Sequence, residues 1–95
     1  MNDKEFTYLV INLITEDMLN VTDNVILFVY GEERGRNIID ELAAAVLSGY
    51  IHKLPINKKI NNKKIHTGDF YYKMLPKGAK VSGINFLGYD PRIKK

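Results

Sequence analysis

The chain has 95 residues, of which 45% are hydrophobic and 26% charged, with a formal net charge of +3 at pH 7. This length suits one small domain with a modest core. The absence of cysteine excludes disulfides and thiolate metal sites, and the longest apolar run, VILFVY, is far shorter than the ~20 residues of a membrane span. We expect a single soluble, cytoplasmic domain over residues 1–95, and the abundant Asn, Ile and Lys favour an AT-rich genome, such as a low-GC bacterium or its phage.

Two apolar stretches in the first third of the chain predict strands. Residues 6–14, FTYLVINLI, are rich in β-branched and aromatic side chains and contain no breaker. Thr15, followed by two acidic residues, suits a single helical turn, and VTDN at 21–24 indicates a turn. Residues 25–30 form a second continuous apolar run, which is typical of a buried central strand.

A helix is predicted after Gly31, at about residues 34–48. Ile38, Leu42 and Ala45 recur at helical spacing, and Gly49 suits a C-terminal stop.

The second half of the chain predicts a basic connector and a hairpin. Residues 51–65 combine many lysines with isolated apolar residues, which indicates a long connector, in part extended. Residues 66–75 predict a strand, PKG at 76–78 a turn, and 79–90 a returning strand, before a short basic tail at 91–95.

These elements predict a two-layer α+β fold, in which one main helix packs on a four-stranded, mostly antiparallel sheet. The early strands are too apolar to leave one sheet face in water, so we expect a homodimer or another bound protein.

The glycine turn offers a candidate anion site at Arg34, Gly35 and Arg36. A helix N-terminus and arginine side chains both favour phosphate. Glu32 and Glu33 lie in the same turn and would repel an anion. The spacing matches no phosphate-loop motif, so a structural connector is the preferred interpretation.

Charge is divided unequally along the chain. Residues 1–50 carry three basic and nine acidic side chains, whereas residues 51–95 carry eleven basic and two acidic ones. Lysines interleaved with aromatic rings favour nucleic acid, because lysines neutralise phosphates and rings stack on bases. The candidate residues are Lys53, Lys58, Lys59, Lys63, Lys64, Tyr71, Tyr72, Lys73, Lys77, Lys80 and Arg92.

Three functions remain open at this point. The preferred hypothesis is a small non-enzymatic protein that binds nucleic acid or a nucleotide and needs no cofactor. The first alternative is a phage-type, anti-CRISPR-like inhibitor of a host nucleic-acid-handling or defence enzyme, because an acidic-surfaced protein would also attract these lysines. The second is a metal-independent nuclease that uses His52 and His66 as acid and base. Their spacing fits no metal motif, so no metal site is expected.

Overall fold

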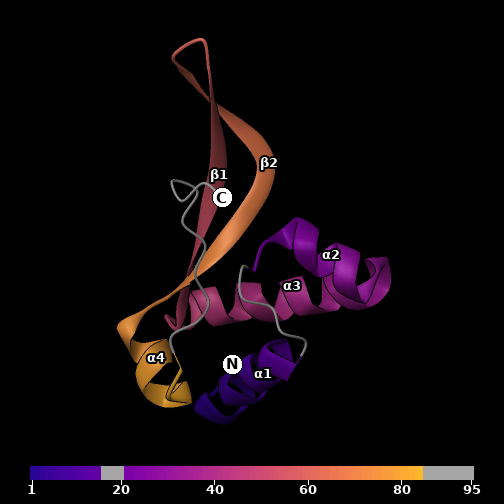
Figure 1. Cartoon of the computed structure of the whole chain (residues 1–95). Coiled ribbons are helices and arrows are strands. Elements are labelled where there is room, and N and C mark those ends of the chain that lie inside the picture. Colours follow the sequence, from indigo (N-terminus) through magenta and orange to yellow (C-terminus); the bar gives the residue numbers. More distant parts are fainter. Residues whose placement is uncertain (16–20, 85–95) are drawn as a thin grey trace.

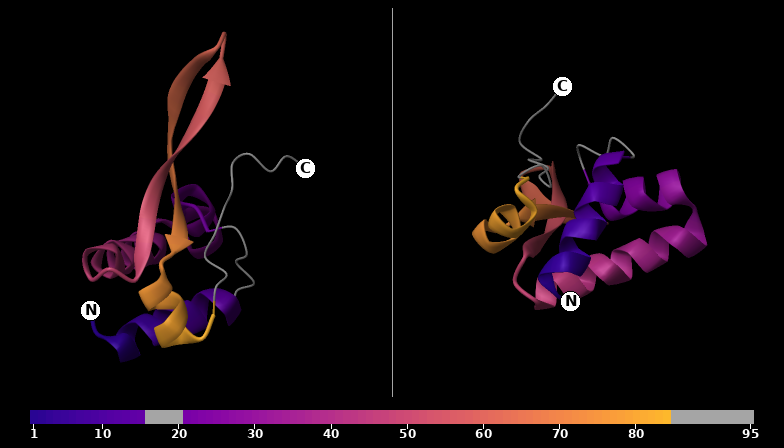
Figure 2. Two further views of the ribbon diagram at one scale, coloured as in Figure 1. Left: turned by 90° about the vertical axis from the view of Figure 1, so that its left-hand side faces the viewer. Right: turned by 90° about the horizontal axis from the view of Figure 1, so that it is seen from below.

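The computed structural model describes residues 1–15 and 21–84, which form four helices and one two-stranded antiparallel sheet (Figure 1). The elements are α1 (Asp3–Thr15), α2 (Asp23–Tyr30), α3 (Glu32–Leu47), β1 (Ile51–Ile60), β2 (Lys63–Met74) and α4 (Pro76–Ser82). The helices form a body at one end of the molecule, and the two strands project from it as a hairpin (Figures 1 and 2). The chain is therefore α+β, but the predicted four-stranded sheet covered by one main helix is wrong.

The predicted strand at 6–14 lies in helix α1. Its buried side chains are Phe6, Leu9, Val10 and Leu13, which follow the helical spacing of three and four residues. Asn2 and Glu5 exchange hydrogen bonds at the start of the helix, each side chain accepting from the other's backbone N–H, which makes a capping box. Helical periodicity and capping thus prevailed over the β propensity of the β-branched residues.

The predicted strand at 25–30 is also helical. Thr22 caps α2, because its Oγ1 accepts a hydrogen bond from the N–H of Val25 at 3.1 Å. Ile26 is the buried residue of this helix, whereas Phe28 is 90% exposed. A continuous apolar run does not distinguish a strand from a helix. The cap at Thr22 satisfies a backbone N–H of the first turn and so favours the helix.

The helix predicted at about 34–48 is confirmed as α3, which begins two residues earlier, at Glu32. Gly49 ends it as predicted. Gly49 has a φ of 81°, its N–H donates to the carbonyl of Val46, and the N–H of Tyr50 donates to that of Ala45. This pattern is a Schellman motif, in which glycine accommodates the left-handed backbone at the helix end.

The predicted connector at 51–65 is instead β1 and the start of β2. The two strands pair from Ile51 opposite Met74 to Ile60 opposite Lys63. Asn61 and Asn62 form the two-residue turn with φ values of 50° and 64°. Asparagine tolerates positive φ, and two such residues make the hairpin turn whose twist matches the flanking strands.

The segment after β2 also departs from the prediction. The strand predicted at 66–75 is confirmed within β2, but its partner precedes it in the chain. Pro76 begins helix α4 in place of a turn, and Gly83 caps that helix in a left-handed conformation. Residues 79–82 are thus helical. Residues 85–90 of the predicted returning strand, the tail at 91–95 and residues 16–20 of the predicted single helical turn lie outside the described residues.

The core lies where α1, α3 and the base of the hairpin meet. The rings of Phe6 and Tyr50 stack with centroids 4.5 Å apart, and the Tyr50 hydroxyl donates to Asp3, an acceptor that raises the pKa of Tyr50 to about 12. At the base of the hairpin, the side chains of Ile51 and Tyr72 pack in this core. None of the helices in the described part of the chain is long and apolar enough to cross a membrane.

Candidate nucleic-acid interface

The outer part of the hairpin, residues 57–66, is called the distal arm. Its side chains are exposed, apart from the half-buried Asn57. Among residues 1–15 and 21–84, it is joined to the body through the rest of the hairpin (Figure 1). A two-stranded hairpin alone is marginally stable in water, so the arm depends on the anchoring of its base in the core.

The distal arm has two chemically different faces, because paired residues share a face and neighbours along a strand alternate. The isoleucine face consists of Lys58, Ile60, Lys63 and Ile65, and the lysine face of Asn57, Lys59, Lys64 and His66. Ile60 and Ile65 are 49% and 45% exposed. They occupy diagonal positions of the ladder, close enough for their side chains to form one apolar patch.

Within the described part of the chain, the lysines of the distal arm form no ion pair with a carboxylate. Residues 57–66 contain four lysines and no acidic residue. Among residues 1–15 and 21–84, the ion pairs are Arg36 with Glu32 and Lys53 with Asp23, both outside the arm. Binding of an anion to these four lysines therefore requires no ion pair of the described residues to be broken.

Asp23, at the start of α2, anchors the hairpin to the body. Its carboxylate accepts a hydrogen bond from the hydroxyl of Tyr72 and lies 3.5 Å from the Lys53 ammonium. Burial and the bond to Asp23 raise the pKa of Tyr72 well above its ordinary value. Lys53 also lies over the ring of Phe70, 4.6 Å from its centroid. These contacts join both strands to α2.

An irregularity in the ladder, between Pro55 and Asn57, separates the anchored base from the distal arm. Thr67 Oγ1 donates to the carbonyl of Ile56 at 2.9 Å, and Gly68 has a φ of 88°. Asp69 accepts hydrogen bonds from the N–H groups of Asn24 and Phe70. The strand irregularity is thus held by specific bonds, as expected of a bulge that directs the outer part of a hairpin.

The structure brings together only part of the predicted nucleic-acid set. Lys58, Lys59, Lys63 and Lys64 converge on the distal arm, whereas Lys53 and Lys73 lie at the base and Lys77 and Lys80 on α4. Tyr72 is fully buried, so it cannot stack on a base, and Tyr71 is half-buried. Arg92 lies outside the described residues. The lysines after Tyr50 are therefore divided among the distal arm, the base of the hairpin and α4 over the described residues.

The isoleucine face is absent from the connector predicted at residues 51–65, because it exists only in a hairpin. A usable indication is present in KKINNKKI, where an Asn-Asn pair separates two identical KKI segments. A two-residue pair that accepts positive φ between such segments is a hairpin pattern.

The predicted anion site lies in the first half of α3. Gly35 is buried against α2, and a Cβ at this position would come within 3.0 Å of Leu27 Cδ2 and 3.2 Å of the Ile26 carbonyl oxygen. Arg36 pairs with Glu32 at 3.3 Å, and Arg34 lies over the ring of Tyr30. Glycine here permits close packing of two helices, which favours the connector interpretation.

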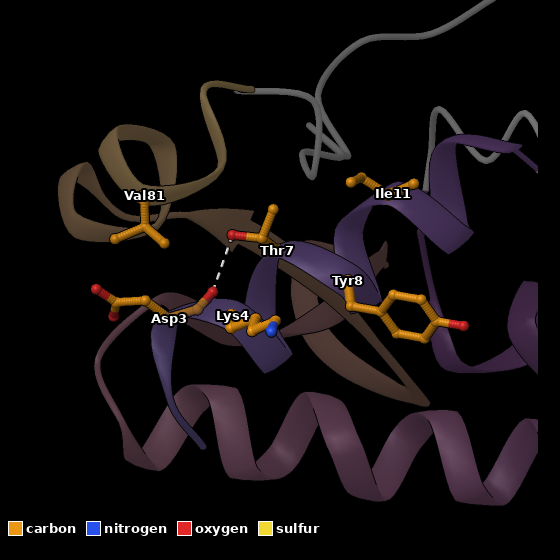
Figure 3. A pocket seen from close by; sticks show the side chains of 6 residues that line it. All are labelled: Asp3, Lys4, Thr7, Tyr8, Ile11 and Val81. Carbon is orange, nitrogen blue, oxygen red and sulfur yellow. Dashed lines mark hydrogen bonds between the residues drawn. The ribbon is translucent and has the colours of Figure 1, made fainter.

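A second surface feature is an open groove between α1 and α4, lined by Asp3, Lys4, Thr7, Tyr8, Ile11 and Val81 (Figure 3). Two of its polar groups already have partners: the Thr7 hydroxyl donates to the carbonyl of Asp3, and the Asp3 carboxylate accepts from the Tyr50 hydroxyl. Within the described ranges, no group of three His, Asp or Glu residues is placed to hold a metal ion.

The chain was also compared with models of protein families, with curated proteins and with solved structures. None of the three comparisons finds a match.

Proposed function

We propose that this protein binds nucleic acid through the distal arm. The observation that carries the proposal is the convergence of Lys58, Lys59, Lys63 and Lys64 on a projecting ribbon without carboxylates. Each lysine that neutralises a phosphate releases condensed counterions, and this release is the main source of affinity for nucleic acid.

The form of the arm supports a polymer over a free nucleotide as the ligand. A nucleotide site is a concave pocket that encloses most of its ligand. The distal arm instead projects from the body (Figure 2) and distributes its charges over both faces. Such a surface can contact several phosphates along a strand, but it does not enclose a single one.

A binding titration tests this function directly. We expect the full chain to bind DNA or RNA oligonucleotides, with an affinity that falls steeply as salt increases, because salt cations compete with the lysines for the phosphates. Fluorescence anisotropy with labelled single- and double-stranded DNA and RNA, at several salt concentrations, gives the affinity and the slope. No binding at low salt, or a response independent of salt, would contradict the proposal.

The geometry does not favour the nuclease alternative. His52 pairs with Lys73 and His66 with Asn57, and positions 52 and 57 of β1 are five residues apart. At about 3.4 Å per residue, the two histidine positions lie about 17 Å apart along the hairpin. A general acid and a general base must both reach one phosphate, which this arrangement does not provide.

A protein-binding role is the second candidate, and a specific observation favours it. Val25, Phe28 and Val29 form an exposed apolar stripe along α2, at helical spacing. Such a stripe suits a second copy of the chain or a host protein.

The mass in solution tests the dimer form of this second candidate. We expect Phe28→Ser to convert a dimer into a monomer, while Lys58→Gln leaves the mass unchanged. Sedimentation equilibrium of both variants and the wild type measures this. A wild-type monomer at all concentrations would remove the dimer, and a dimer unaffected by Phe28→Ser would place its interface elsewhere.

A further inference from the structure

We propose that the distal arm enters the major groove of duplex DNA with its isoleucine face toward the base edges, where Ile60 and Ile65 contact thymine methyl groups. This inference rests on the proposed nucleic-acid function and specifies its ligand. Ile60 and Ile65 are about half exposed, although a protein of this size has few large apolar side chains with which to build its core.

The chemistry of the isoleucine face identifies what it meets. Isoleucine cannot bond to a phosphate, so Ile60 and Ile65 gain free energy only against an apolar group. On the base edges of the major groove that group is the C5 methyl of thymine. Lys58 and Lys63 share this face, and Lys59 and Lys64 have flexible side chains long enough to reach phosphates at the rim of the groove.

The dimensions of the arm fit this groove. The two strands of a ribbon lie about 4.8 Å apart. The major groove is about 12 Å wide and admits such a ribbon with its side chains, whereas the minor groove, about 6 Å wide, is too narrow for it. Four residue pairs, from Asn57 with His66 to Ile60 with Lys63, precede the turn. At about 3.4 Å per residue they extend about 10 Å, the length of about three base-pair steps along the groove.

Single strands and double-stranded RNA fit the described arm less well. Single-strand binding relies on aromatic side chains on which bases stack, and His66 is the aromatic side chain of the distal arm. The His66 ring makes an edge-to-face contact with Phe70, with the ring centroids 5.1 Å apart. Phe70 itself is covered by Lys53. The major groove of A-form RNA is too deep and narrow for side chains to read.

Replacing thymine by deoxyuridine tests the contact, because this change removes the C5 methyl and leaves the phosphates and base pairing in place. The wild type and the variant Ile60→Ser/Ile65→Ser are titrated against A·T-rich duplexes that contain either thymine or deoxyuridine. Serine has no methyl group to contact thymine, and circular dichroism verifies that the variant keeps the fold. Lys59→Gln/Lys64→Gln serves as the matched control from the lysine face.

We expect the wild type to bind the deoxyuridine duplex about three- to fourfold more weakly for each thymine methyl group that an isoleucine covers. The isoleucine variant should bind both duplexes equally, while the lysine control should bind both more weakly and keep the wild-type ratio. Equal wild-type affinity for the two duplexes would overturn the inference, as would an unchanged ratio in the isoleucine variant or tighter binding to single strands than to duplex. Each of these results leaves nucleic-acid binding intact, whereas failure to bind any nucleic acid would remove the proposed function itself.

Discussion

Affinity for nucleic acid should fall about 10²–10³-fold near 0.1 M salt when all four lysines of the distal arm become glutamine, in the variant Lys58→Gln/Lys59→Gln/Lys63→Gln/Lys64→Gln. These side chains lie together on the projecting hairpin with no carboxylate among them. Each phosphate that is no longer neutralised also lowers the slope of log affinity against log salt by about 0.9 for duplex DNA. Anisotropy titrations across salt measure both the affinity and the slope.

Two double variants of equal net charge separate the position of the charges from their number. Lys58→Gln/Lys63→Gln removes two lysines from the arm, and Lys77→Gln/Lys80→Gln removes two from α4. We expect the arm variant to lose most of its affinity and the α4 variant to lose little, because long-range attraction is screened within about 10 Å at 0.1 M salt. Equal losses in the two variants would show that net charge, and not the arm, determines binding.

Phe6→Ala should lower the free energy of unfolding by about 3–5 kcal/mol, the usual cost of removing a large buried ring. Phe6 is fully buried and its ring stacks on Tyr50. A small domain has about 5–15 kcal/mol in total, so this variant should be close to unfolded at moderate temperature. Chemical denaturation followed by circular dichroism provides the measurement.

Tyr8→Ala is the matched control, because it removes another aromatic ring two residues away in the same helix. Tyr8 is 68% exposed, so we expect its removal to change the stability by no more than about 0.5 kcal/mol. In a strand, positions 6 and 8 would share one face and the two costs would be similar. Similar losses of stability in both variants would therefore contradict helix α1.

The two wrong strand predictions have one physical cause. Residues 6–14 and 25–30 are rich in β-branched and aromatic side chains, so their composition predicts strands, whereas the spacing of their buried residues is helical. β propensity spans only ~1 kcal/mol and depends on context, whereas burying Phe6, Leu9, Val10 and Leu13 together on one helix face contributes several times more. The capping box at Asn2 and the cap at Thr22 were visible in the sequence and supported helices.

The amino-acid sequence by itself determined the features that depend on neighbouring residues. The position of α3, its end at Gly49 and the extended character of residues 66–74 all follow from local periodicity and backbone preference. The excess of lysine after residue 50 is likewise a property of the sequence. Only the tertiary structure decided which of these lysines lie together. Pairing β1 with β2 gathers four of them on one arm and places Ile60 and Ile65 on a common face, whereas Tyr72 is buried at the base. Such a grouping depends on the register in which the strands pair, because a shift by one residue would move every side chain of a strand to the other face.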